Sequence, residues 1–217
     1  MSDSHESVDL VADETVERLA LAAVVAALTA ALAQISIPVP GLPAPISFQP
    51  FGVYAAGLLL GARWGGLSML LYVLTGAAGV PVFSSASGGL GVVLGPTGGY
   101  LVGYVLAAVV IGLLAHGGLD AKRPSAVPTW RQSLALLAGI TVIYAVGVPW
   151  LAETTDSSLS AAMAVPLAPP FVALSGPTVS MPQAVVVGAA IFLPGDVLKI
   201  LATLGIVRSG ELDALVE

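Results

Sequence analysis

Residues 48–78 read FQPFGVYAAGLLLGARWGGLSMLLYVLTGAA, two apolar runs that the segment GARWGG separates. Arg63 is the only formally charged residue of the stretch. We expect two membrane helices, over about residues 48–61 and 67–78, with GARWGG as the turn between them. Both are shorter than the roughly 20 residues that a straight helix needs to cross hydrocarbon, so irregular backbone beside a cavity should lie near them.

The whole chain shares this lack of charge. Of its 217 residues, 57% are hydrophobic and only 9% are charged, and the mean hydropathy is +0.97. A soluble domain needs a polar surface to stay dispersed, whereas a chain surrounded by lipid does not, so we predict an integral membrane protein. The first apolar segment follows an acidic run, Asp9 to Glu17, rather than a basic one, which argues against a cleaved signal peptide.

Four further apolar segments bring the expected number of helices to six, and they cover about residues 19–35, 99–114, 133–151 and 192–206. The sequence therefore predicts an all-α membrane protein, a bundle of six transmembrane helices within residues 17–208. Residues 1–16 form an acidic tail before the bundle and residues 209–217 a tail after it. Residues 152–182 form a long outer connection that is rich in proline.

Positive charge is distributed unevenly over the loops of this bundle. The loops around residues 37–47, 79–97 and 152–192 contain no Lys or Arg. Because cytosolic loops of membrane proteins carry an excess of Lys and Arg, we predict that these loops are outside and that both termini are cytosolic. The predicted cytosolic side holds Arg18, Arg63, Lys122, Arg123, Arg131 and Arg208.

The segment LPGDVLK, residues 193–199, places Asp196 and Lys199 in the last predicted helix. They are the only Asp, Glu, Lys or Arg residues that we place inside a span, where an unpaired charge is costly, and their spacing puts them on one helix face. Two interpretations stay open: a structural ion pair, or a ligand site in which Lys199 reaches an anion and Asp196 accepts hydrogen bonds. Pro194 and Gly195 break or start the helix here, and the free N–H groups of such a helix end suit an anionic ligand.

The glycine-rich segments invite a nucleotide-binding interpretation that their spacing excludes. GPTGGY, residues 95–100, lacks the Lys-Ser/Thr ending of a phosphate loop, so any ATP that drives this protein must bind to another subunit. Cysteine is absent, and no Ser-His-acid set, metal cluster or hydrolytic carboxylate pair can be assembled, so neither an enzyme nor a cofactor is expected. The net charge of −6 leaves no basic surface for nucleic acid.

The first predicted helix carries small residues at four-residue spacing. One stripe consists of Ala22, Ala26 and Ala30, and a second one runs alongside it through Ala23, Ala27 and Ala31. Small residues at this spacing let another helix approach closely in a membrane, so we predict that Ala22, Ala26 and Ala30 form a docking face for a partner.

Several long motifs resemble one family of membrane proteins. They lie within residues 19–204 and read AALAQISIPVP, ISFQPFGVYAAGLLLGARWGGLSMLLYVLTGAAGVPVF, GGLGVVLGPTGGYLVGY, IYAVGVPWLA and FLPGDVLK. In these motifs the chain resembles the substrate-binding S components of energy-coupling-factor (ECF) vitamin transporters, specifically the biotin-specific BioY group. The resemblance implies a multi-pass protein of the plasma membrane that binds biotin near its outer face, under the loops that join helices one and two and helices three and four.

The resemblance also implies which residues form the biotin site. Its PGDxxK element is matched here by residues 194–199, so Asp196 and Lys199 would face the vitamin. Biotin has a ureido group with two N–H donors and a carbonyl, a thioether bicycle and a carboxylate, which suit a carboxylate, a cation and aromatic walls. Which end of biotin meets Lys199 stays open. The other implied site residues are Gln49, Ser87, Thr97, Gly98, Tyr100 and Tyr144.

Partners follow from the same resemblance. A membrane-embedded ECF coupling subunit and two cytosolic ATPase subunits would join the chain, with the alanine face of the first helix as the contact. The chain itself would capture biotin for ATP-driven uptake without catalysing a reaction. Two alternatives remain compatible with the residues: a stand-alone proton-coupled transporter in which Asp196 titrates, and an S component for another vitamin.

Overall fold

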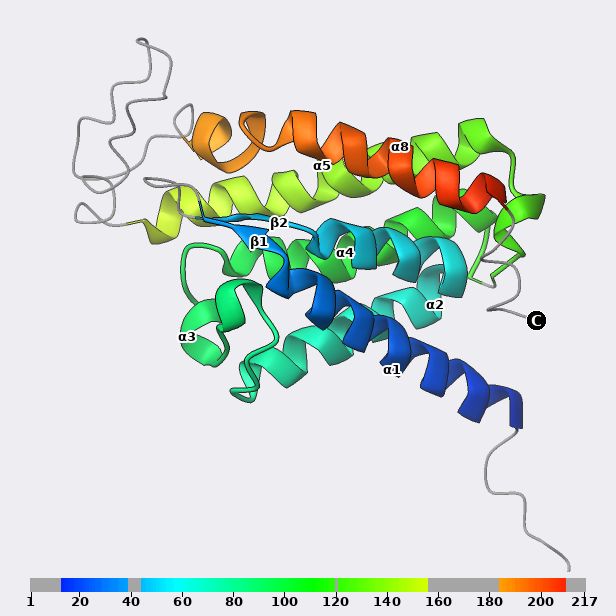
Figure 1. Ribbon diagram of the computed structural model, residues 1–217, viewed down its shortest axis with the longest axis horizontal. Helices are drawn as coiled ribbons and strands as arrows, with labels where there is room; N and C mark the ends of the chain where they lie inside the picture. The colour runs from blue at the N-terminus through cyan, green and yellow to red at the C-terminus, as the bar shows by residue number, and fades with distance from the viewer. Residues whose placement is uncertain (1–12, 39–43, 120, 156–183, 210–217) are drawn as a thin grey trace, which may run out of the picture.

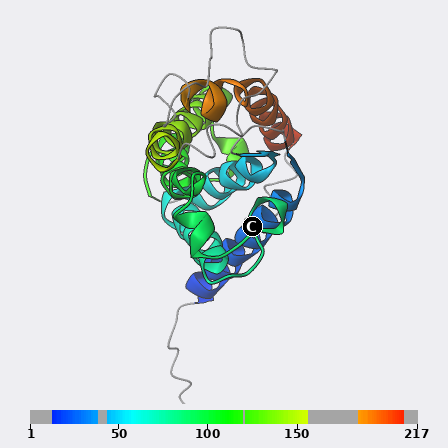
Figure 2. The same ribbon diagram turned by 90° about the vertical axis from the view of Figure 1, so that its left-hand side faces the viewer.

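The computed structural model describes residues 13–38, 44–119, 121–155 and 184–209. The described part is mostly helical, and Figures 1 and 2 show its long helices gathered into one bundle. The predicted N- and C-terminal tails and the predicted outer connection lie almost entirely outside the described residues. The long helices are α1 (Asp13–Gln34), α2 (Gln49–Ala77), α4 (Gly98–His116), α5 (Thr129–Thr154) and α8 (Leu193–Ser209).

Short elements join these helices. A two-stranded antiparallel sheet, with Ser36 opposite Ser47, links α1 to α2, and a π-helical turn leads into α8. Most short elements lie at the left-hand end of the bundle in Figure 1, which is the predicted outer end. The short elements are β1 (Ser36–Ile37), β2 (Ile46–Ser47), η1 (Ser84–Ala86), α3 (Leu90–Val93), η2 (Pro124–Ala126) and the π-helical turn η3 (Val186–Ala190).

Helix α2 contains the predicted hairpin. Gly61 has a φ of 74° and a ψ of −172°, a conformation outside the helical region that glycine adopts readily because it lacks a Cβ. The side-chain Nε2 of Gln49 donates a hydrogen bond of 2.6 Å to the Tyr72 hydroxyl. In a straight helix about 34 Å of rise would separate residues 23 positions apart, so the chain must reverse at Gly61. Residues 49–60 and 62–77 are therefore two antiparallel helices.

The turn is tighter than the sequence predicts. We expected GARWGG as a turn and the next helix from about residue 67, but only Gly61 leaves the helical conformation and the second half already begins at residue 62. Gly65 explains how the halves can cross so soon, because a Cβ there would lie 2.5 Å from the backbone oxygen of Ala56. The glycines of this segment thus form the turn and also let the two halves of α2 pack closely against each other.

His116 holds the other side of this reversal. It is buried, the Lys122 backbone N–H donates to its Nδ1 at 3.0 Å, and its Nε2 lies 3.3 Å from the Gly57 carbonyl oxygen. Since Nδ1 accepts a hydrogen bond, Nε2 carries the hydrogen and donates to the Gly57 carbonyl, which lies in the last turn before Gly61. The buried His116 side chain of α4 thereby joins the loop at Lys122 to the first half of α2.

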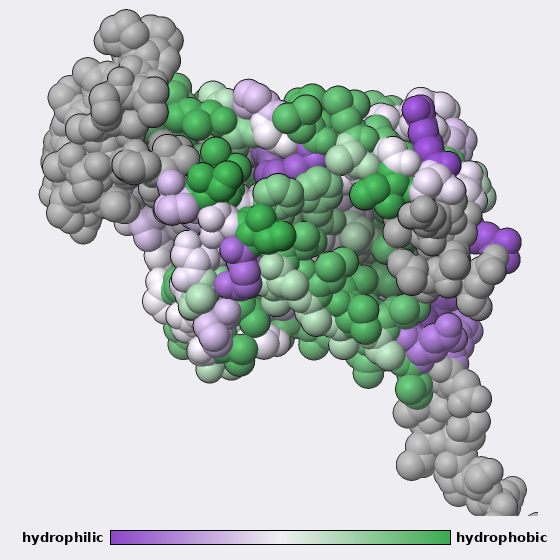
Figure 3. All heavy atoms as spheres, in the orientation of Figure 1, coloured by the Kyte–Doolittle hydropathy of each residue, from purple (hydrophilic) through white to green (hydrophobic). Residues whose placement is uncertain are grey.

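The outer surface of the bundle suits lipid. Large hydrophobic side chains such as Val24 and Leu198 are exposed on α1 and α8, at 62% and 67%. Figure 3 shows hydrophobic residues over much of the visible flank, with hydrophilic residues gathered at the right-hand end where α1 begins. Among the described residues, five helices are long and apolar enough to cross a membrane, and one of them is the reversed α2. The described residues thus confirm a multi-pass membrane protein with the six predicted helical segments.

The alanine stripe that we predicted as a docking face is used inside the chain. Ala22 is 0% exposed, Ala26 is 8% exposed and Ala30 packs against the core. The Ser68 hydroxyl of α2 donates a hydrogen bond of 2.8 Å to the Ala22 carbonyl, so α2 occupies this face. The prediction is therefore wrong for Ala22, Ala26 and Ala30, because their small side chains admit a helix of the same chain.

Candidate ligand-binding site

A cavity of about 340 Å³ opens between the helices at the predicted outer end. Its walls come from the starts of α2, α4 and α8, from the middle of α5 and from the loop segments around β2 and α3. Aliphatic and aromatic side chains, among them Leu101, Ile140, Ile143 and Phe192, form much of the lining. A largely apolar cavity with a few polar groups is the usual form of a small-molecule site.

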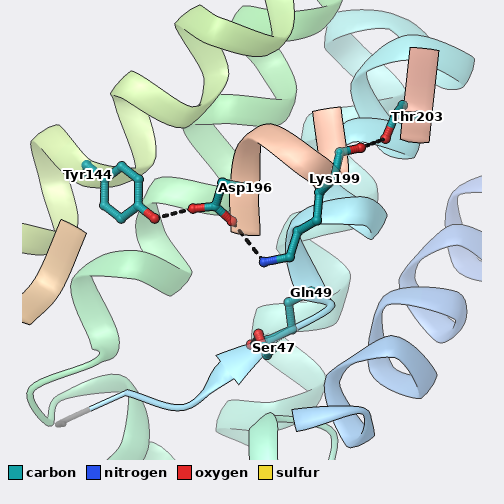
Figure 4. A network of polar contacts seen from close by, with 6 residues as sticks. All are labelled: Ser47, Gln49, Tyr144, Asp196, Lys199 and Thr203. Carbon is teal, nitrogen blue, oxygen red and sulfur yellow. Dashed lines mark hydrogen bonds and ion pairs between the residues drawn. The ribbon is translucent and has the colours of Figure 1, made fainter. Parts of the chain in front are cut away.

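The polar side chains of α8 form the charged part of this lining. The Lys199 ammonium lies 2.8 Å from Oδ1 of Asp196, and the Tyr144 hydroxyl of α5 donates a hydrogen bond to Oδ2 of the same carboxylate (Figure 4). Asp196 and Lys199 are only 3% and 8% exposed. The two residues thus form a buried ion pair, as the structural interpretation predicts, and both also line the cavity. The ligand interpretation of LPGDVLK stays a prediction.

The start of α8 determines where this pair lies. The helix begins at Leu193, with Pro194 in its first turn, where a missing N–H costs no helical hydrogen bond. Asp196 also lies in the first turn, where the positive end of the helix dipole stabilises a carboxylate. One turn further on, the Thr203 hydroxyl donates to the Lys199 carbonyl at 2.8 Å. The α8 backbone thus presents both charges at the cavity.

Tyrosines build the wall opposite α8. The Tyr100 and Tyr144 rings meet edge to face with their centroids 6.3 Å apart. The Tyr100 hydroxyl donates a hydrogen bond of 2.8 Å to the Gly188 carbonyl in η3, which ties α4 to the lead-in of α8. Such a wall offers flat apolar area while its hydroxyls stay hydrogen-bonded.

Gln49 joins the two outer loops at the other side of the cavity. Its Oε1 accepts hydrogen bonds from the Ser47 hydroxyl at 2.8 Å and from the Ser84 hydroxyl at 2.7 Å. Its Nε2 donates to the Tyr72 hydroxyl, which in turn donates to the Val82 carbonyl at 3.0 Å. The Gln49 oxygen is thus occupied within the protein, and one N–H of its amide remains for a ligand.

The structure brings together all but one of the residues that we predicted for the site. Gly98 does not line the cavity: a Cβ there would lie 1.7 Å from the Val93 carbonyl oxygen, so its role is to let α3 pack directly on the start of α4. Sequence reasoning missed Tyr104 and Ser47, although the spacing of Tyr104 four residues after Tyr100 places both on one helix face. The predicted residues in the lining are Gln49, Ser87, Thr97, Tyr100, Tyr144, Asp196 and Lys199.

This arrangement has the chemistry of a binding site. The lining offers a carboxylate, an ammonium and several hydroxyls around an apolar space, which suits a small molecule that carries hydrogen-bond donors, acceptors and an apolar body. Among the residues that the structure describes, no group of three or more His, Cys, Asp or Glu could hold a metal ion.

The sequence of the chain is similar to those of known membrane transporters. The chain is 34% identical over 159 residues to the biotin transporter BioY of Rhizobium etli, which covers 73% of each chain. It is 43% identical over 131 residues to the biotin transporter BioY of Thermotoga maritima, covering 60% of this chain and 72% of the relative.

A solved structure shares the fold. The S-component for biotin from an ECF-type ABC transporter superposes with a TM-score of 0.72 at 24% identity, over 92% of this chain and 93% of the other. The sequence model of the BioY family matches residues 4–213, nearly the whole chain. This protein therefore belongs to the BioY family.

Proposed function

We propose that the chain is the membrane-embedded biotin-binding subunit, or S component, of an ECF-type importer in the plasma membrane. The observation that carries this proposal is the cavity of about 340 Å³ with the Asp196–Lys199 pair in its wall. Biotin brings N–H donors for a carboxylate, and both of its ends bring acceptor oxygens for an ammonium. Its bicycle and aliphatic chain suit the apolar and aromatic remainder of the wall.

The proposed subunit binds biotin and leaves energy coupling to partners. Membership in the BioY family and the fold of an S component support a coupling subunit in the membrane and ATPase subunits in the cytosol. The alanine stripe that remains exposed on α1, namely Ala23, Ala27 and Ala31, supports a docking face for the coupling subunit. This stripe replaces the buried one in the proposal.

Equilibrium binding of biotin to the purified protein in detergent tests the function. We expect saturable binding by the intact chain and at least a tenfold weaker affinity in Asp196→Asn and Lys199→Ala, since each variant removes a charged hydrogen-bond partner. Lys122→Ala, at the predicted cytosolic end, is the matched control and should bind as the wild type does.

Three outcomes separate the possibilities. No biotin binding by the intact protein refutes the proposal. If both charge variants bind biotin with unchanged affinity, the proposed function stands, but Asp196 and Lys199 have a structural role only. Stronger binding of another vitamin in competition would identify an S component with different specificity.

A further inference from the structure

Three of the five tyrosines in the chain have hydroxyls that are hydrogen-bonded within the protein. Tyr72, Tyr100 and Tyr144 donate to the Val82 carbonyl, the Gly188 carbonyl and the Asp196 carboxylate. For the hydroxyls of the other two, Tyr54 and Tyr104, the described part of the chain offers no hydrogen-bond partner. Of these two only Tyr104 lines the cavity, so its hydroxyl is the one that a ligand can reach.

Tyr104 lies in the cavity wall with its ring buried and its hydroxyl open to the cavity. The residue is 7% exposed and belongs to the hydrophobic core. Among the described residues, the unpaired side-chain atoms that the protein covers completely belong to Tyr54 and Gln132 alone. The unpaired Tyr104 hydroxyl is therefore in contact with open space, and the cavity is the space that this residue lines.

The position of Tyr104 on α4 places it at the inner part of the cavity. Helix α4 begins at Gly98 at the predicted outer end, and Tyr104 lies one turn further into the bundle than Tyr100. At this level α4 packs on Ile143 of α5, since a Cβ at Gly103 would lie 3.0 Å from the Ile143 Cα. Ile143 also lines the cavity, so the wall beside Tyr104 is aliphatic on the α5 side.

A ligand that fills this part of the cavity separates the Tyr104 hydroxyl from water. A hydroxyl that loses water without gaining another partner weakens binding, whereas a ligand with a matching group restores the hydrogen bond. A phenol has one hydrogen to donate and lone pairs that accept, and only donation uses its hydrogen. The matching group of the ligand is thus a hydrogen-bond acceptor.

We propose that Tyr104 is a specificity-determining residue of the cavity: its hydroxyl donates a hydrogen bond to an acceptor oxygen at the inner end of the bound ligand. The inference rests on the proposed function, in which the ligand is biotin. Biotin carries such an oxygen at each end, in the ureido carbonyl and in the carboxylate. A similar molecule without an oxygen at the inner end leaves the hydroxyl unpaired and binds more weakly.

The first test is Tyr104→Phe, which keeps the ring and removes the hydroxyl, measured in detergent by biotin titration and by thermal unfolding without ligand. We expect the affinity for biotin to fall roughly three- to tenfold, the loss of one hydrogen bond. The unfolding temperature should stay unchanged, because the ligand-free protein loses no hydrogen bond. Tyr72→Phe, outside the cavity lining, is the matched control for unfolding and should unfold at a lower temperature, since it loses the bond to Val82.

Two biotin analogues separate direct contact from a structural effect. One is 2-iminobiotin, in which an imino group replaces the ureido carbonyl oxygen, and in the other a methyl group replaces the carboxylate. Tyr104→Phe should bind the analogue that lacks the contacted oxygen as well as the wild type does. It should lose affinity for the other analogue by the same factor as for biotin, whereas a change in packing would weaken both alike.

Four results contradict the inference. Equal affinity of Tyr104→Phe and the wild type for biotin refutes it while the proposed function stands, and so does an equal loss of affinity for both analogues. An unfolding temperature that falls as far as that of Tyr72→Phe also refutes it, because the hydroxyl would then have a partner within the protein. Absence of biotin binding by the wild type refutes the proposed function and this inference together.

Discussion

At the scale of the residue, one carboxylate organises the site. Asp196 accepts a hydrogen bond from Tyr144 of α5 and pairs with Lys199 one turn along α8, and both charges are almost fully buried. A pair of this kind is favourable only when its remaining hydrogen-bond positions are also used. Sequence reasoning identified both charges because they stood alone in an apolar segment.

The buried pair makes a prediction about stability. Lys199→Ala should destabilise the ligand-free protein by about 3–5 kcal/mol, since it leaves the Asp196 carboxylate without its cation. The double variant Asp196→Leu with Lys199→Met should recover most of this loss, because it removes the charge together with its partner and keeps the volume. Unfolding in detergent by temperature or denaturant measures both variants. A double variant as unstable as the single one would show that packing, rather than the unpaired charge, causes the effect.

At the scale of the element, two details separate prediction from structure. The sequence predicts two helices with GARWGG between them, and the structure confirms both but places the reversal at Gly61 alone. In α1 the two alanine stripes are alike in composition, and the one that we predicted to be free is covered by α2. Local sequence predicts that a helix can dock closely. It cannot say which of two equal faces the same chain occupies.

The exposed stripe of α1 makes a prediction about assembly. Ala27→Leu should leave biotin binding by the isolated chain unchanged, because the side chain points away from the bundle, and should reduce co-purification with the ECF coupling subunit severalfold. Ala26→Leu is the matched control: it overfills the contact with α2 and should destabilise the chain by about 1–3 kcal/mol. Normal assembly of the Ala27→Leu variant would locate the docking face elsewhere.

At the scale of the whole molecule, the bundle has two different ends. The cavity and the Gln49 network lie at one end, and the Gly61 reversal, His116 and the loop with Lys122 lie at the other. In Figure 1 the start of α1 and the end of α8 share the second end, as six antiparallel segments require. From the positive-inside rule we expect the cavity to open toward the outside, from which a vitamin would arrive in the proposed function.

This orientation can be measured directly because the chain contains no cysteine. Leu94→Cys, at an exposed position near the cavity, should react in intact cells with a maleimide that cannot cross membranes. Lys122→Cys should react only after the cells are opened. The opposite pattern would invert the topology, and labelling of both residues in intact cells would rule out a transmembrane bundle.

The sequence by itself determined what each segment can do. Apolar composition predicted a membrane protein with six helical segments, and the predicted turn included Gly61. Asp196 and Lys199 were predicted as site residues because charge is costly in lipid. The tertiary structure alone decided which surfaces meet: that α2 covers Ala22, that Gly98 serves packing, and that Tyr144 and Lys199 converge on Asp196. The physical reason is that composition and spacing act locally, whereas contacts between residues 144 and 196 depend on how several helices pack at once.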